Sequence, residues 1–104
     1  MKDEDLMYEF YQLPEEDKGY KEEYEGHLVA IYLNICSTLT KLNRKNDAIH
    51  SADEALKIKE TAKAYYKKAQ SYIQFINRDS EDIKLGFYYL NKSYEISKDA
   101  IIIQ

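Results

Sequence analysis

One pattern of large and small residues occurs twice in this chain, 33 residues apart. The first copy is Tyr32-x-x-Ile35-Cys36-x-x-Leu39, and the second is Tyr65-x-x-Lys68-Ala69-x-x-Tyr72. Between the copies lies Ala48-x-x-x-Ala52-x-x-Ala55-Leu56, in which small residues recur at helical spacing. Because small side chains let two helices approach closely, the pattern predicts a helix-turn-helix unit that is repeated along the chain.

Helical periodicity covers most of the chain and predicts the all-α class. Only three glycines and one proline interrupt the 104 residues, so few positions break a helix. The segments that we expect to be helical are 3–13, 20–42, 47–59, 61–73 and a last one beginning at Ser80. Asn46 or Asp47 is the expected N-cap of the third segment, and Thr61 that of the fourth. The longest segment, 20–42, is amphipathic, with apolar residues at Tyr24, Leu28, Ile31, Tyr32, Ile35, Leu39 and Leu42.

The second helical unit differs from the first in length. The spacing of Ala48, Ala52, Ala55 and Leu56 is repeated by Gly86, Leu90, Ser93 and Tyr94. However, 17 residues separate Ala69 from Gly86, whereas 12 separate Cys36 from Ala48. We therefore expect a five-residue insertion in the polar segment near residues 76–82.

Composition and motif content argue against several classes of function. No apolar run approaches the length of about 18 residues that a membrane span needs. His27 and His50 lie 23 residues apart, without Cys or His near either at ligand spacing, so we expect no metal site. We also expect no catalysis, no cofactor and no nucleic-acid binding, and a cytoplasmic location. Cys36, the single cysteine, is expected to be a buried side chain that packs like a small hydrophobe.

The net charge of −4 is unevenly distributed. Residues 1–25 carry ten acidic and three basic side chains, whereas the remainder carries nine acidic and twelve basic ones. Within the acidic part, Glu22, Glu23 and Glu25 have the pattern of a solvated helix face rather than of an acid/base pair. The basic excess of the repeat region could attract an acidic partner segment.

In the spacing and size of its residues, the repeated unit resembles the tetratricopeptide repeat. The resemblance implies one domain over residues 1–104, built as a short right-handed solenoid of about five helices. Segment 3–13 would be the remnant of a first repeat, 24–59 one full repeat, and 61–96 a second one with the insertion. Solenoids usually close with polar capping elements, and none is evident at either end here. We therefore expect a fragment of a longer protein that can pair with itself through its open ends.

The resemblance also places a candidate binding site. In a tetratricopeptide array the leading helices of successive repeats line a concave groove, so Asn34 and Lys67, 33 residues apart, would be neighbours along it. Lys63 lies one turn before Lys67 on the same helix face. The residues expected close to these three are Ser37, Tyr66 and Gln70, with Leu33 offering apolar contact. One amide and two ammonium groups on a single surface suit a ligand that carries carboxylates.

At these positions the chain is similar to the second and third repeats of carboxylate-clamp co-chaperones, including the immunophilin and aryl-hydrocarbon-receptor-interacting types. The matching stretches are 32–36, with Leu39 and Leu42, and 63–69. The resemblance implies that Asn34, Lys63 and Lys67 occupy three of five clamp positions, and that the ligand is the acidic Glu-Glu-Val-Asp tail of a heat-shock chaperone. Lys67 stands where arginine is usual, which removes a bidentate grip. The alternative is a scaffold repeat that binds another protein, or itself, without a carboxylate clamp.

Overall fold

The computed structural model describes residues 18–75 and 77–103, with their side chains from residue 19 to residue 99. Over these ranges the regular structure consists of four helices: α2 (Lys18–Lys41), α3 (Lys45–Ile58), α4 (Ala62–Ile73) and α5 (Ser80–Ile103). The all-α prediction is confirmed, since no strand occurs in this part of the chain. The predicted helix at 3–13 lies outside the described residues, and so does position 76 of the expected insertion.

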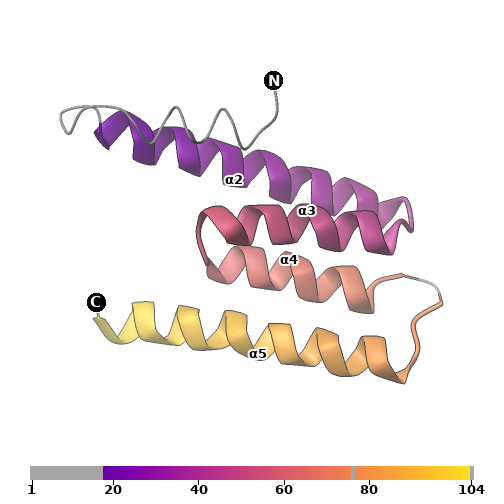
Figure 1. Ribbon diagram of the computed structural model, residues 1–104. Helices are drawn as coiled ribbons and strands as arrows, with labels where there is room; N and C mark the ends of the chain where they lie inside the picture. Colours follow the sequence, from indigo (N-terminus) through magenta and orange to yellow (C-terminus); the bar gives the residue numbers. More distant parts are fainter. Residues whose placement is uncertain (1–17, 76, 104) are drawn as a thin grey trace.

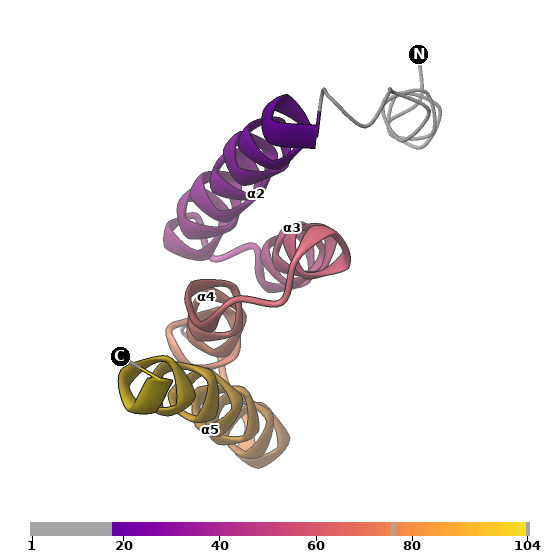
Figure 2. The ribbon, with the colours of Figure 1, turned by 90° about the vertical axis from the view of Figure 1, so that its left-hand side faces the viewer.

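The four helices lie side by side in chain order, each antiparallel to the one before it (Figure 1). Contacts join α2 to α3 and α4 to α5, and further contacts join α3 to α4 and α2 to α4. In the end-on view, α2 and α5 lie at opposite ends of this stack (Figure 2). The two sequence-adjacent helix pairs correspond to the two helical units predicted from the repeat.

Small side chains make the contacts between the helices, as the sequence predicted. Five alanines are fully buried at these contacts: Ala48, Ala52, Ala55, Ala64 and Ala69. One cluster of the core joins Val29 and Leu33 to Ala55 and Ala64, and a second joins Cys36 to Ala48 and Ala52. The burial of Cys36 is confirmed. Because most of these side chains are methyl groups, the backbones of α2, α3 and α4 approach one another closely.

Helix boundaries follow local signals in two of the predicted places. Thr61 is the N-cap of α4, and its Oγ1 accepts a hydrogen bond of 3.1 Å from the backbone N–H of Ala64. α5 begins at Ser80, also as predicted. The predicted cap of α3 is wrong: its N-cap is Arg44, without a side-chain cap hydrogen bond. The chain reverses early because Asn43 takes a φ of 60°, in the left-handed region that asparagine tolerates well.

The buried face of α2 differs from the apolar stripe predicted for residues 20–42. The buried side chains of this helix are Val29, Leu33 and Cys36. Ile31 and Ile35, which the pattern assigned to the apolar face, are exposed. α2 therefore carries apolar side chains on two faces, of which one is covered by α3 and α4.

The second helix pair is held together by a close approach and by a stack of aromatic rings. Gly86 of α5 lies against Ile73 and the carbonyl of Ala69, where any larger residue would overlap Ile73. The Tyr89 ring lies between those of Tyr65 and Tyr72, with centroid separations of 6.2 and 5.9 Å. These contacts fix α5 on α4 in spite of the longer connection between the two helices.

A partly buried ion pair ties the first turn of α5 to the beginning of α3. Lys45 Nζ lies 3.0 Å from Asp82 Oδ1 and 4.6 Å from the centroid of the Phe75 ring. Asp82 also accepts a hydrogen bond from the backbone N–H of Asp79, and its own N–H donates to the Asp79 carboxylate. These hydrogen bonds, together with Lys45, hold the pKa of Asp82 below its ordinary value even though burial opposes the shift.

Candidate functional site

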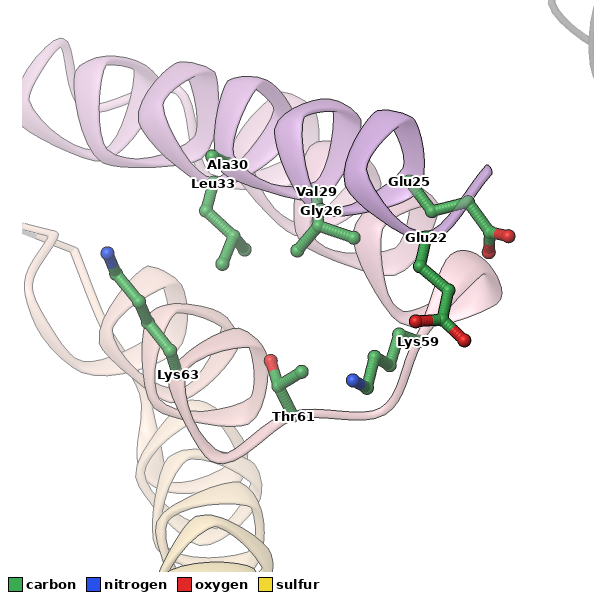
Figure 3. Close-up of a pocket in the computed structure, with 9 residues that line it drawn as sticks. All are labelled: Glu22, Glu25, Gly26, Val29, Ala30, Leu33, Lys59, Thr61 and Lys63. Carbon is green, nitrogen blue, oxygen red and sulfur yellow. The ribbon is translucent and has the colours of Figure 1, made fainter. Parts of the chain in front are cut away.

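A pocket of about 620 Å³ opens between α2 and the beginning of α4 (Figure 3). Its apolar wall comes from Val29, Ala30 and Leu33 of α2. Lys63 extends from α4 on the side of Leu33, whereas Glu22 lies at the opposite end of the pocket (Figure 3). The remaining lining residues are Glu25, Gly26, Lys59 and Thr61. The pocket therefore joins an apolar wall to the Lys63 ammonium group at one end and, at the other, to the side chains of Glu22 and Lys59 (Figure 3).

The structure places the predicted site residues on the two leading helices, α2 and α4. On α2, Asn34 is exposed and Ser37 is half-buried. On α4, Lys63 and Tyr66 are exposed, whereas Lys67 and Gln70 are half-buried. Of these six residues only Lys63 lines the pocket. Leu33, predicted to offer apolar contact, does so as part of the pocket wall, although only 2% of it is exposed.

Three small side chains, those of Cys36 and Thr40 on α2 and of Ser71 on α4, join the two helices next to the backbone of Lys67. Cys36 Sγ lies 3.2 Å from Ser71 Oγ and 3.8 Å from the backbone carbonyl oxygen of Lys67. Ser71 Oγ donates to the same carbonyl at 3.0 Å, and it lies 3.4 Å from Thr40 Oγ1. Asn34 and Ser37 lie within two residues of Cys36 on α2. The contacts of Cys36 therefore fix the distance between this part of α2 and the turn of α4 that carries Lys67.

The lysines of α4 differ in what they contact. Lys68 forms an ion pair of 2.6 Å with Asp53 and lies 4.2 Å from the centroid of the Tyr89 ring. Burial alone would lower the pKa of Lys68, but Asp53 and Tyr89 outweigh it and raise the pKa. Lys63 and Lys67, in contrast, form no ion pair with any residue that the structure describes. Lys68 thus stabilises the fold, whereas Lys63 is exposed and Lys67 is half-buried without an ion pair among the described residues.

Of the nine residues that line the pocket, the sequence analysis named only Leu33 and Lys63 as part of a site, and it missed the other seven. Glu22 and Glu25 had been assigned to a solvated helix face, yet both line the pocket. A usable signal existed, because Glu22, Gly26, Val29 and Leu33 follow one another at the four- and three-residue spacing of a single helix face. Glu23, from the same acidic run, is exposed and lies 3.7 Å from His27 Nε2.

A second pocket, of about 460 Å³, lies at the far ends of α2 and α4. Lys41 and Arg78 supply two cations to it, and Arg78 donates a hydrogen bond of 3.3 Å to the carbonyl oxygen of Ile73. The other lining residues are Thr40, Asn43, Ile73 and Gln74. The charged residues that line the second pocket are therefore both cations, whereas those that line the first are two glutamates and two lysines.

The described residues offer no cluster of His, Cys, Asp and Glu that could hold a metal ion. None of the described helices is long and apolar enough to cross a membrane. Searches against protein-family models, curated proteins and solved structures found no match for the chain.

Proposed function

We propose that the chain is a tetratricopeptide-like interaction module that binds the acidic C-terminus of a partner protein through Asn34, Lys63 and Lys67. The observation that supports this function best is the pair of lysines on α4, which lack ion pairs within the described structure and of which Lys63 lines the pocket. By resemblance to carboxylate-clamp co-chaperones, the partner is a heat-shock chaperone with a Glu-Glu-Val-Asp tail.

The chemistry of the surface suits a terminal carboxylate. The ammonium groups of Lys63 and Lys67 and the amide of Asn34 all donate hydrogen bonds, and a carboxylate accepts them with two oxygens. Each charge-assisted hydrogen bond contributes on the order of 1.5 to 3 kcal/mol. After the cost of association, three such contacts leave a Kd of about 10 μM to 1 mM.

The pocket also suggests how the ligand is oriented. An apolar side chain next to the carboxylate would fit against Val29 and Leu33, close to Lys63. Glu22 and Glu25, at the opposite end, would repel acidic residues there. The free carboxylate is therefore expected at the Lys63 end, because at the other end Glu22 lies on the same side as Lys59 (Figure 3).

A second candidate function is a scaffold repeat that makes apolar contacts with another protein. It is favoured by the large apolar side chains that stay exposed on α2 and α5, including Ile31, Ile35 and Phe87. A scaffold of this kind would bind whether or not the ligand ends in a free carboxylate, which separates the two functions.

Fluorescence polarisation with a labelled peptide ending in Glu-Glu-Val-Asp tests the proposal. We expect the free acid to bind and its C-terminal amide to bind at least about tenfold more weakly, the loss that corresponds to about 1.4 kcal/mol. Lys63→Ala and Lys67→Ala should each weaken binding by a similar factor, and added salt should weaken it further. Lys84→Ala, which removes an exposed lysine from α5, is the matched control. Equal binding of acid and amide would refute the clamp and leave the scaffold function.

A further inference from the structure

We propose that copies of this chain stack head to tail, with the exposed face of α2 in one copy docking on the exposed face of α5 in the next. The α2 stripe consists of Ile31 and Ile35 of α2 together with Leu42, in the turn directly after the helix. The α5 stripe consists of Ile83, Phe87, Leu90 and Tyr94. These two surfaces lie on the two outermost described helices of the stack (Figure 2).

The α5 stripe has the spacing of a helix-packing surface. Its four residues follow one another at intervals of four, three and four, which places them on one side of the helix. Ile83, Phe87 and Tyr94 are between 39% and 64% exposed. A different side of α5 faces α4, since Gly86 approaches Ile73 there and Ser93 Oγ donates a hydrogen bond of 2.8 Å to the carbonyl of Ala62. The apolar stripe is therefore additional to the surface that packs within the helix pair.

The internal repeat provides a direct comparison for this end of the molecule. Leu33 of α2 and Tyr66 of α4 occupy equivalent positions, 33 residues apart. Leu33 is 2% exposed and packs in the cluster that contains Ala64 of the following leading helix. Tyr66, in contrast, is 44% exposed. The side chain that packs against the first helix of the following pair is therefore buried at Leu33, and its equivalent in the second pair, Tyr66, is exposed.

The α2 stripe is the surface that fits such a position. Ile31, Ile35 and Leu42 are between 44% and 61% exposed. Ile31 and Ile35 lie one turn apart on the same side of α2, and Leu42 follows in the turn after the helix. α2 and α5 each contain 24 residues, so the two stripes run along helices of equal length. α2, like α4, is the first helix of its pair. Within the chain, α4 packs against the preceding pair α2 and α3. In the stack, α2 of the next copy would pack in the same way against the preceding pair α4 and α5.

The packing within the chain indicates the direction of the contact. Each sequence-adjacent helix pair is antiparallel (Figure 1). We therefore expect α5 of one copy and α2 of the next to run antiparallel as well.

The contact joins two different surfaces, so it does not close on itself in a dimer. Each copy keeps one unused stripe of each kind, and further copies can add at both ends. Size should therefore grow with concentration, rather than stop at two copies.

Sedimentation velocity on the full chain over a range of concentrations tests the proposal. We expect the wild type to show a mean mass that rises with concentration. Ile35→Glu disables the α2 stripe and Phe87→Glu the α5 stripe; since both side chains are exposed, both variants should keep their circular dichroism spectrum. Each variant alone should be monomeric, whereas their equimolar mixture should form dimers and nothing larger, because one intact surface of each kind remains. Tyr88→Glu, at an exposed tyrosine on another side of α5, is the control that should still associate like the wild type.

Three outcomes would overturn the proposal. A wild type that stays monomeric at high micromolar concentration shows that a second copy is not the occupant of these surfaces. Dimers of Phe87→Glu or of Ile35→Glu alone show a symmetric contact. A mixture of the two folded variants that remains monomeric shows that the α2 and α5 stripes do not bind each other.

Discussion

Gly86→Ala offers a sharp test of how α4 and α5 pack. In a helix interior, alanine is about 1 kcal/mol more favourable than glycine. At position 86, however, the added Cβ would overlap Cγ1 and Cδ1 of Ile73 and lie 3.5 Å from the carbonyl oxygen of Ala69. Isoleucine in a helix has one strongly preferred χ1 rotamer, so Ile73 cannot easily turn away. Overpacking of this kind costs about 1 to 3 kcal/mol, which leaves a net destabilisation of up to about 2 kcal/mol.

Two further variants isolate the cause. Gly26→Ala, in α2, meets nothing within 4 Å and should raise the free energy of unfolding by about 0.5 to 1 kcal/mol. In an Ile73→Ala background the obstruction is gone, so Gly86→Ala should there become stabilising by a similar amount. The expected coupling energy of the double-mutant cycle is about 1 to 3 kcal/mol.

Urea unfolding followed by far-ultraviolet circular dichroism at low protein concentration measures these values. If Gly86→Ala stabilises the wild type as much as Gly26→Ala does, the close approach of α5 to Ile73 is refuted. A Gly86→Ala change that remains destabilising in the Ile73→Ala background would place the obstruction elsewhere.

Two smaller predictions concern helix ends and the partly buried ion pair. Thr61→Ala should lower the free energy of unfolding by about 1 kcal/mol, because the Ala64 N–H loses its cap. Arg44→Ala, at the N-cap of α3, removes no cap hydrogen bond and should lower it by less in the same urea titration. Because the pKa of Asp82 is lowered in the folded state, its contribution to stability is fully present above the ordinary aspartate pKa of about 3.9 and is lost as the pH falls through the lower folded-state value. Unfolding midpoints measured between neutral and acidic pH should therefore converge for the wild type and Asp82→Asn at the acidic end, with Glu81→Gln as the control for a change of charge in the same turn.

The features that could be predicted from the sequence are those with local causes. The threonine cap at the start of α4 and the beginning of α5 at Ser80 depend on residues within one turn, and both predictions are confirmed. The contacts of Ala48 and Ala52 were predictable because small residues at helical spacing have few other uses. The cap of α3 failed because the left-handed turn at Asn43 moved the helix start earlier than the polar side chains suggested.

The burial of α2 could not be predicted in the same way. This helix has one apolar face that contains Val29 and Leu33 and another that contains Ile31 and Ile35, and periodicity favours both. Which face is covered depends on where α3 and α4 lie, and that is set by contacts between distant residues. The glutamates of the pocket were missed for a related reason: an exposed glutamate and a glutamate at the mouth of a pocket have the same pattern in the sequence.

The proposed stacking and the proposed peptide site share the row of lysines on α4, so they should be linked. Within the chain, Asn34 of α2 is the predicted neighbour of Lys67 on α4. In a head-to-tail stack, Lys67 of one copy would lie beside α2 of the next copy in the same way. A carboxylate bound there would contact both copies, and each equilibrium would then strengthen the other by the same factor. We expect the free-acid peptide to raise the sedimenting mass of the wild type, the amidated peptide to leave it unchanged, and Phe87→Glu to bind the free acid more weakly than the wild type does. A free-acid peptide that disperses the stack would show instead that ligand and neighbouring copy compete for the same row.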